Sequence, residues 1–530
     1  MLKNIYKHRI NILLIIILIL AAYLRLYRIS DYMTFLGDEG RDLIEVKKIL
    51  SGDLVFLGPR SSAADFYYGP IYFYLITPFL WLFNYDPVGP AVFIALLGVV
   101  TVYLVYYVGK ELLNERVGLI SAALYAVSPL VIAYSRSSWN PNPMPFVSLL
   151  LLFSAYKAIK DYSFKFFILS GVLMGIAMQL QYIAIFLGVI LALFVISGSI
   201  IEKKTRSIIF IIKSYFYIMI GFIIGWSPFL AFEIKHGFPN LKTIVNYIFY
   251  GGTDATSSTS NGFIQNVQSV AFQLFGRLLT RFPPPEQLSL DNNISLQALQ
   301  IGTLILGIGS LFAIFKIKNR LTKCLLFIWF FVGVILFGFY KKDVYDYYLG
   351  FMFSLPFLLV GNLISMLWND KVTQLSVGKA KIKLSGLANY SLMALSVGAF
   401  LSLLIFNFAG NPFRNTPNRQ KEQVKEIAKF IISKTNNKPY NFALLTNGNS
   451  DHGYRYYLDI LNHQPITLLY EGADPQRKSV TDQLLVVCED PDCQPVGAGL
   501  WEVAGFGKAE IEGVWSVSVV KVYRLIHVVE

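Results

Sequence analysis

Residues 11–28 read NILLIIILILAAYLRLYR, an apolar block preceded by the basic residues Lys3, Lys7 and Arg9. An α-helix of about 20 apolar residues crosses the roughly 30 Å of hydrocarbon in a bilayer. Further blocks of this kind follow along the 530 residues, of which 55% are hydrophobic and 15% are charged. Only α-helices and closed β-barrels pair all their backbone polar groups in lipid, and these blocks lack the two-residue alternation of a barrel strand. The chain is therefore predicted to be a polytopic α-helical membrane protein.

The charges of the short loops set the number and direction of the spans. Cytoplasmic loops carry an excess of Lys and Arg, and a cytoplasmic N-terminus with about eleven spans puts the Lys-rich connections on that side. The first block has no small-residue cleavage site, so we expect a retained anchor and not a signal peptide. The spans are predicted at 11–28, 88–109, 117–134, 145–157, 166–179, 183–200, 214–232, 297–316, 324–340, 347–367 and 389–409.

Residues 69–87, GPIYFYLITPFLWLFNYDP, are apolar but short, and Pro78 interrupts them. Counting them as a span would move every later Lys-rich loop to the outside, so an interfacial or re-entrant helix is predicted. The net charge of +13 lies in the cytoplasmic loops, whereas the region from Asn411 onward is nearly neutral. The positive charge therefore reflects membrane topology, and no nucleic-acid partner is expected.

Two units are predicted along the chain. Residues 1–409 form the transmembrane domain, with a first external loop at 29–87 and a large external loop at 233–296. Residues 410–530 form a small external α/β domain, because QKEQVKEIAKFIISK has helical periodicity and NFALLT and DQLLVVCED resemble buried strands. The stretch WSVSVVKVYRLI, 515–526, alternates like one half-buried strand. Cys488 and Cys493 fit a small-loop disulfide if this domain faces outward.

The densest group of charged residues is LGDEGRD, 36–42, just after the first span. Asp38 and Glu39 offer a base, and Arg41 beside them offers a cation for an anionic leaving group. The plainer alternative is a solvated helix N-terminus, where acidic residues favour the positive end of the helix dipole. Asp65, in ADFYYGP, belongs to the same external loop.

This arrangement resembles the GT-C glycosyltransferases, and most closely the branch of protein O-mannosyltransferases and lipid A aminoarabinose transferases. The shared features are an N-terminal span, an external loop that opens with Asp-Glu, an aromatic-Gly-Pro interfacial helix, bundled spans and an external C-terminal domain. Recognisable motifs cover about 29–200, and the remainder agrees only in layout. The resemblance implies transfer of a sugar, with inversion, from a polyprenyl-phosphate donor to an acceptor on the outer face of the membrane.

The resemblance also implies roles for individual residues. The acidic residue of the family's first external loop matches Asp38, which becomes the candidate base or acceptor-orienting residue, with Glu39 helping to hold the site. The family often has a second acidic residue before a Pro-Pro pair, but here Tyr67 stands at that position and Gly69 replaces one proline. A divalent cation built on two carboxylates is therefore an open question for this chain.

Other external positions are predicted to bind the donor phosphate or the substrate. Arg suits bidentate binding of phosphate, and Trp suits stacking on a sugar face. The alternatives are an interfacial aromatic for Trp139 and an interhelical hydrogen bond for Gln181. The predicted set is Arg41, Asp65, Tyr68, Arg136, Trp139, Asn140, Gln181, Tyr182, Lys341 and Tyr345.

The sequence thus predicts a hexosyl- or pentosyltransferase in the plasma membrane, with an extracytoplasmic C-terminal domain. Its expected partners are a polyprenyl-phosphate sugar, membrane lipid and an acceptor protein, lipid or polysaccharide. Two other functions remain as hypotheses. One is a transporter or flippase of a lipid-linked saccharide, although its usual midplane charges and internal repeats are not evident. The other is a catalytically inactive relative, which the missing second acidic residue keeps open.

Overall fold

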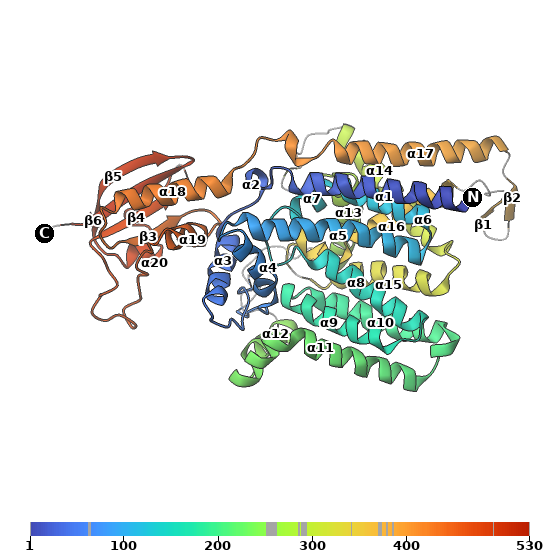
Figure 1. Ribbon diagram of the computed structural model, residues 1–530, viewed down its shortest axis with the longest axis horizontal. Coiled ribbons are helices and arrows are strands. Elements are labelled where there is room, and N and C mark those ends of the chain that lie inside the picture. Colours follow the sequence, from blue (N-terminus) through green and yellow to red (C-terminus); the bar gives the residue numbers. More distant parts are fainter. Residues whose placement is uncertain are drawn as a thin grey trace.

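The computed structural model describes residues 2–61, 65–250, 262–284, 287, 294–340, 342–368, 374–377, 380–383, 386–490 and 492–528. Helices lie side by side along the long axis of the molecule, and a small domain with a sheet sits at one end (Figure 1). The start of the chain lies at the opposite end of the bundle. The predicted fold class, a helical membrane domain followed by a small α/β domain, is confirmed.

Helices form the part of the chain before residue 409. The long ones are α1 (Leu2–Leu26), α5 (Val88–Leu112), α8 (Met144–Lys160), α9 (Phe164–Leu180), α10 (Ala184–Ile201), α11 (Ile208–His236), α14 (Ile294–Phe315), α15 (Arg320–Phe337) and α17 (Gly386–Phe408). Shorter ones are α2 (Ile29–Tyr32), α3 (Gly37–Leu50), α4 (Ile71–Leu82), α6 (Glu115–Val127), α7 (Pro129–Tyr134), α12 (Pro239–Tyr250), α13 (Phe263–Leu279) and α16 (Ser354–Leu367), with a 3-10 turn, η3, at Asp346–Met352. Strands β1 (Gln374–Val377) and β2 (Ala380–Lys383) pair antiparallel.

The number of membrane spans differs from the sequence-based count. Within the described residues, seven helices are long and apolar enough to cross a membrane, and η3 with α16 makes an eighth as a bent pair. The predicted count of eleven is therefore not confirmed, although each of those segments contains helix. The count is lower because α6, α8 and α9 have only 13 to 17 residues. The segment at 69–87 forms α4, a helix of 12 residues containing Pro78.

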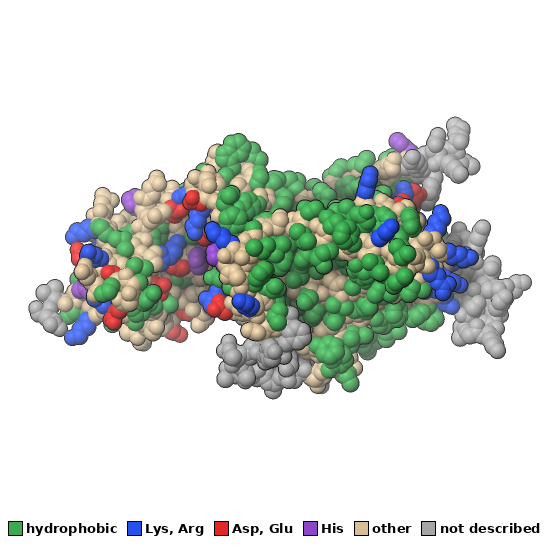
Figure 2. Space-filling view, turned by 90° about the horizontal axis from the view of Figure 1, so that it is seen from below, with side chains coloured by type: hydrophobic (Ala, Val, Ile, Leu, Met, Phe, Trp, Pro, Cys, Tyr) green, Lys and Arg blue, Asp and Glu red, His purple; other side chains and the backbone are tan. Residues whose placement is uncertain are grey.

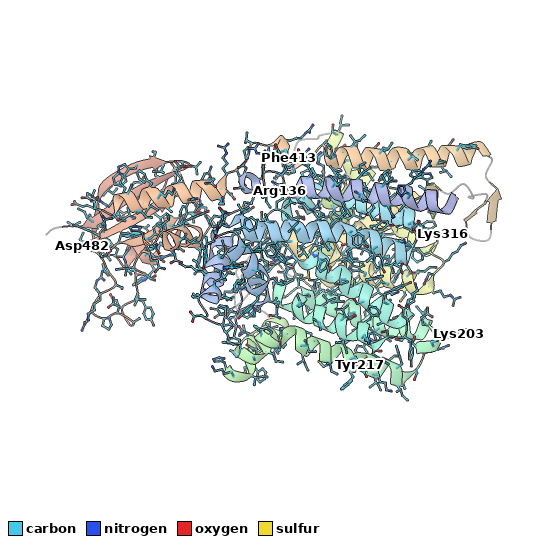
Figure 3. The ribbon with its side chains drawn as sticks, in the orientation of Figure 1. Arg136, Lys203, Tyr217, Lys316, Phe413 and Asp482 are labelled. Carbon is cyan, nitrogen blue, oxygen red and sulfur yellow. A yellow bond between two sulfur atoms is a disulfide. The ribbon has the colours of Figure 1, made fainter. Side chains whose placement is uncertain are left out.

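Hydrophobic side chains cover the middle of the molecule, and Lys and Arg gather at the end far from the C-terminal domain (Figure 2). Lys203 and Lys316 mark that basic end (Figure 3). An apolar belt between two polar ends is what a bilayer requires, because charged groups are excluded from its hydrocarbon. The bundle is thus a multi-pass membrane domain with the C-terminal domain on one side and the basic loops on the other.

Small residues bring α9 and α11 into backbone contact. A Cβ at Gly171 would lie 2.0 Å from the carbonyl oxygen of Ile218, and one at Gly221 would lie 2.0 Å from that of Ile168. Such close packing is a usual way to join helices in lipid. Gln179, near the end of α9, then donates to the Gly225 carbonyl (2.6 Å). Its oxygen accepts from the Ile71 amide (3.3 Å), which fixes the start of α4.

The C-terminal domain contains a four-stranded sheet with the order β3-β4-β6-β5. Its strands are β3 (Asn441–Leu445), β4 (Gln483–Cys488), β5 (Ala509–Val517) and β6 (Val520–His527), with helices α18 (Gln420–Lys434), α19 (His452–Ile460) and α20 (Trp501–Ala504). Strands β3 and β4 are parallel, and β6 runs antiparallel to β4 and β5. The disulfide considered from the sequence is present between Cys488 and Cys493.

One strand prediction in this domain was wrong. Residues 515–526 are not one strand, because β5 ends at Val517 and β6 begins at Val520. Ser518 adopts a left-handed conformation with φ of 52°. That conformation fits a two-residue hairpin turn, which reverses the chain inside a run that alternates on both sides.

The C-terminal domain packs directly against residues 29–87. The Arg419 amide donates to the Asp31 carbonyl (3.0 Å), and the Tyr456 hydroxyl donates to the Tyr85 carbonyl (2.7 Å). Lys47 of α3 pairs with Asp459 of α19 at 2.7 Å. At the start of α3, the Gly37 amide donates to the side chain of Asn449, in the loop after β3 (2.9 Å).

Candidate functional site

Helix α3 begins at Gly37 and carries the charged cluster in its first two turns. The Glu39 carboxylate accepts a hydrogen bond from the Leu36 amide (2.9 Å), which satisfies one donor at the helix start. Acidic residues in the first turn and Lys47 and Lys48 in the last turn both complement the helix dipole. The local sequence therefore explains why a helix starts here with two carboxylates beside its N-terminus.

The three carboxylates of this cluster differ in environment. Burial raises the pKa of Glu39 to about 7. Burial also raises the pKa of Asp42 to about 6, against the opposing effect of Arg41, which donates to it at 2.8 Å. The Asp38 side chain is 51% exposed and pairs with Arg41 at 2.8 Å. Asp38 is thus the carboxylate of the cluster that solvent and a substrate can reach.

Asp38 lines a cavity of about 430 Å³ at the junction of the two domains. Its wall comes from residues within 34–39, within 133–142 and within 448–450. The polar groups are hydroxyls and amides in addition to Asp38 and Glu39, and Trp139 provides an aromatic face. No Lys or Arg is among the described residues that line it. The cavity is therefore suited to a group rich in hydroxyls and without negative charge.

One polar atom of the cavity wall is buried without a hydrogen-bond partner among the described residues. Asn142 donates to the Ser137 carbonyl (2.7 Å), but its own side-chain oxygen is buried and has no hydrogen-bond partner among the described residues. A buried acceptor without a partner costs about 1–3 kcal/mol.

Part of the predicted site is brought together here. Asp38, Glu39 and Trp139 share the cavity, and Arg41 reaches it through its ion pair with Asp38. The Trp139 ring packs edge-on against Tyr347 with centroids 4.6 Å apart. Tyr347 belongs to an aromatic cluster that includes the predicted residues Tyr68, Tyr182 and Tyr345 and also Tyr340 and Tyr348. The cluster lies beside the cavity, because Tyr347 contacts Trp139 of its wall.

Other predicted residues lie elsewhere. Arg136 is buried and donates to the carbonyls of Leu24, Tyr27 and Arg28, so it caps the end of α1. Asn140 donates to the Leu180 carbonyl (2.8 Å) and joins two helix ends. Asp65 pairs with Arg60 on an exposed turn.

The last two predicted residues are Gln181 and Lys341. Gln181 is buried, and neither atom of its amide has a hydrogen-bond partner among the described residues. It therefore does not make the interhelical hydrogen bond considered from the sequence. Lys341 lies outside the described residues.

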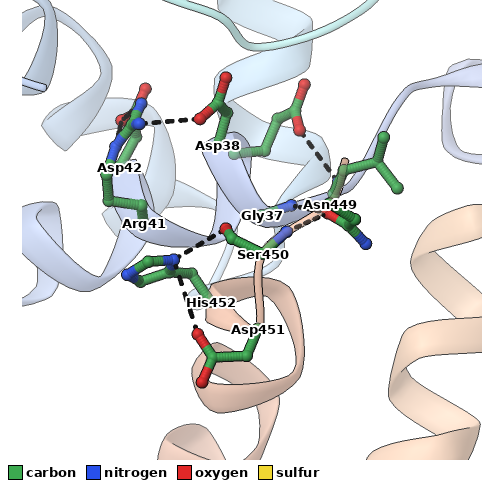
Figure 4. A network of polar contacts seen from close by, with 10 residues as sticks. Gly37, Asp38, Arg41, Asp42, Asn449, Ser450, Asp451 and His452 are labelled. Atoms are coloured by element: carbon green, nitrogen blue, oxygen red, sulfur yellow. Dashed lines mark hydrogen bonds and ion pairs between the residues drawn. The ribbon is translucent and has the colours of Figure 1, made fainter. Parts of the chain in front are cut away.

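Two contributors to this region were missed in the sequence. Arg277 of α13 forms a bidentate ion pair with Asp346, with nitrogen–oxygen distances from 2.7 to 3.1 Å, and acts electrostatically on Tyr134 of the cavity wall. Asn449 and Ser450 reach the cavity from the C-terminal domain (Figure 4). A signal for this loop was present, because the polar run NGNSDHG follows a buried strand, and ligands often bind beyond the carboxyl ends of parallel strands.

A second cavity of about 430 Å³ lies on another side of α3. It is lined by Arg41, Arg60 and His236 together with apolar residues of the 55–59 segment.

Within the described part of the chain, no group of three or more His, Cys, Asp or Glu side chains is placed to hold a metal ion.

Comparison with known proteins bears on the fold of the chain. Residues 68–230 match the profile of the dolichyl-phosphate-mannose-protein mannosyltransferase family. ArnT from Cupriavidus metallidurans, solved bound to undecaprenyl phosphate, superposes with a TM-score of 0.62 over 97% of both chains at 12% identity. The chain has the GT-C fold.

A second relative in structure supports the same fold. The archaeal oligosaccharyltransferase AglB from Archaeoglobus fulgidus, solved with an inhibitory peptide and a dolichol-phosphate, gives a TM-score of 0.53 at 13% identity. That match covers 91% of this chain and 69% of AglB. Among curated protein sequences, none matches the chain. The resemblance drawn from the sequence is thus confirmed for the fold over nearly the whole chain.

Proposed function

We propose that this protein is a glycosyltransferase that moves a monosaccharide from a polyprenyl-phosphate donor to an acceptor on the extracytoplasmic face of the plasma membrane. The observation that carries the proposal is the exposed Asp38 carboxylate in a cavity lined by hydroxyls, amides and Trp139. This cavity lies at the end of a GT-C bundle that is opposite the basic loops. The similar proteins solved with undecaprenyl phosphate and dolichol-phosphate support a lipid phosphate as the donor.

In this reaction Asp38 accepts the proton of the acceptor hydroxyl as its oxygen attacks the anomeric carbon. The bond between that carbon and the donor phosphate breaks, and the phosphate leaves with the electron pair. Attack opposite to the leaving group inverts the configuration at the anomeric carbon. Arg41 orients the Asp38 carboxylate, because its guanidinium forms an ion pair with it at 2.8 Å. Glu39 holds the start of α3 through the Leu36 amide.

The cavity and its surroundings suggest where the parts of the donor bind. The neutral and acidic lining favours an uncharged or amino sugar, hexose or pentose, and disfavours a uronic acid because of repulsion by Asp38 and Glu39. The phosphate needs a cation, and Arg277, which acts on Tyr134 of the cavity wall, would supply one by exchanging its partner Asp346 for the phosphate. Trp139 and the tyrosine cluster supply faces for stacking on the sugar.

A divalent cation is part of the proposal only as an ion that the protein and the donor phosphate bind together. Asp42 is bound by Arg41, and Glu39 is bound by the Leu36 amide. Asp42 Oδ2 is buried without a hydrogen-bond partner among the described residues, but no group of three or more His, Cys, Asp or Glu side chains is placed there to hold a metal ion by the protein alone. Asp38 together with a donor phosphate is the ligand set that would hold such an ion. Measuring transfer with and without EDTA tests this requirement.

The central test compares two variants that change the same chemistry at different places. Asp38→Asn removes the proposed base, and Asp31→Asn is the matched control because Asp31 pairs with Arg28 at the same three-residue spacing on the same external loop. Transfer of labelled sugar from a panel of polyprenyl-phosphate sugars is measured with purified protein in lipid. We expect a loss of about 100-fold or more for Asp38→Asn and near wild-type transfer for Asp31→Asn.

Each other outcome has a consequence. Equal activity of Asp38→Asn and wild type would remove Asp38 from the chemistry. If folded wild type transfers no sugar from any donor, the glycosyltransferase proposal fails. Movement of the labelled lipid across the bilayer would then favour a flippase, and its retention without transfer would favour an inactive relative.

A further inference from the structure

The loop after β3 touches the start of α3 so closely that a side chain is excluded at two positions of the helix. A Cβ at Gly37 would lie 1.9 Å from the Ser450 hydroxyl oxygen. A Cβ at Gly40 would lie 2.4 Å from the backbone nitrogen of Gly453. These two segments are more than 400 residues apart in the sequence, so only the docking of the domains brings them together. The loop is therefore a fixed neighbour of Asp38.

Asn449 is the polar link between the loop and the helix. Its side-chain oxygen accepts hydrogen bonds from the Gly37 amide (2.9 Å) and from the Ser450 amide (2.8 Å). Gly37 opens α3, and the preceding residue, Leu36, has no side-chain oxygen to cap the helix. Asn449 thus performs from another domain the role that an N-cap residue usually performs locally.

The other side of the Asn449 amide is held by Glu489. The amide nitrogen donates to both carboxylate oxygens, at 2.9 and 3.2 Å. The same carboxylate accepts from the hydroxyls of Tyr454 (2.9 Å) and Thr446 (2.6 Å). Because a carboxylate only accepts, the amide nitrogen must face Glu489 and the amide oxygen must face Gly37. The orientation of Asn449 is therefore fixed by the fold of the C-terminal domain.

We propose that Asn449 is a positioning residue, which acts through the first turn of α3 to hold Asp38 against the cavity. The inference rests on the proposed role of Asp38. The C-terminal domain would then be part of the reaction site, since it both lines the cavity and holds the start of the adjoining helix, which carries Asp38. A displacement of about 1 Å in a reacting group lowers a rate by as much as about 100-fold.

Docking of the domain does not depend on Asn449 alone. The pair between Lys47 and Asp459 and the bond from Tyr456 to Tyr85 lie outside the cavity and join the same units. Loss of Asn449 would therefore change the start of α3 and leave the domain in place. If Asn449 served only to dock the domain, substitutions at Asn449, Lys47 and Tyr456 would lower sugar transfer equally.

The test uses a pair of compensating changes in the full-length protein. Asn449→Asp keeps the acceptor for Gly37 but sets a second carboxylate against Glu489, so repulsion moves the side chain. Combining it with Glu489→Gln restores a donor between the two side chains and returns the total charge to that of wild type. Lys47→Met is the matched control, because Lys47 is on α3 and contacts the same domain.

We expect kcat to fall by about 10- to 100-fold in Asn449→Asp, with little change in KM for the donor. The double variant is expected to recover most of kcat, and Lys47→Met to stay within about twofold of wild type. Hydrogen exchange in peptides covering 36–43 should rise in Asn449→Asp and return in the double variant. This second readout does not depend on sugar transfer.

Unchanged kcat and unchanged exchange in Asn449→Asp would overturn the proposal. A folded double variant that does not recover kcat would also overturn it, as would a loss of kcat in Lys47→Met equal to that in Asn449→Asp. If wild type transfers no sugar, the proposed function fails first. Unchanged exchange in Asn449→Asp would then still overturn the link to α3, and raised exchange that the double variant reverses would still support it.

Discussion

Replacing Glu39 by Gln should stabilise the protein at neutral and alkaline pH and leave it nearly unchanged in acid. Burial raises the pKa of Glu39 from 4.5 to about 7 in the folded protein. One unit of pKa corresponds to about 1.4 kcal/mol, so the fully ionised side chain destabilises the fold by about 3 kcal/mol. Because the folded pKa is the higher one, this penalty is absent below about pH 4.5, grows as the pH rises, and is complete above about pH 7.

Gln carries no charge at any pH and keeps the oxygen that accepts from the Leu36 amide. The assay is thermal unfolding of detergent-solubilised wild type and Glu39→Gln between pH 5 and pH 8.5. The variant should melt higher than wild type at pH 8.5, and the difference should shrink to a small fraction towards pH 5. Glu45→Gln, on the same helix beside Lys48, is the matched control. A difference between Glu39→Gln and wild type that does not change with pH, or the same trend in Glu45→Gln, would refute the reasoning.

Two further results are expected. Arg136→Met should destabilise the protein by about 3 kcal/mol or more, because it leaves buried carbonyls at the end of α1 without donors. The exposed Arg28→Met serves as the control in the same melting assay, and an equally small effect of both would contradict the capping role of Arg136. For the topology, an impermeant maleimide applied to intact cells should label Ser433→Cys and not Lys204→Cys in a Cys324→Ala background, since both sites are exposed and lie on opposite sides of the proposed membrane. The reverse pattern would invert the orientation.

Much of the fold could be predicted because each signal for it is local. Apolar blocks of membrane length, a short block broken by Pro78 and buried strands such as NFALLT each report on their own stretch of chain. The span count was less certain because several helices of the bundle are shorter than a bilayer requires and are packed among others. The hairpin at Ser518 was missed because strand alternation continues on both sides of the turn.

The candidate site was only partly predictable, because sequence signals are local and the site is built from segments far apart in the chain. Asp38, Glu39 and Trp139 were found because unusual residues stand out in an apolar chain, and the structure places them in one cavity. Arg136 has the charge and donors of a phosphate ligand, yet it donates to the carbonyls of Leu24 and Tyr27 and caps the end of α1. Residue type gives the chemistry that is available, whereas the partners within hydrogen-bond reach decide how it is used.

The sequence by itself determined that this chain is a helical membrane protein with a small α/β domain and an acidic cluster after its first span. Hydrophobicity and loop charge are sums over neighbouring residues, so no tertiary contact is needed to read them. Only the tertiary structure decided that Asn449 caps the helix bearing Asp38, that Arg277 meets Asp346 and that three separate segments enclose one cavity. Those contacts join residues tens to hundreds of positions apart, and the docking of packed surfaces selects them.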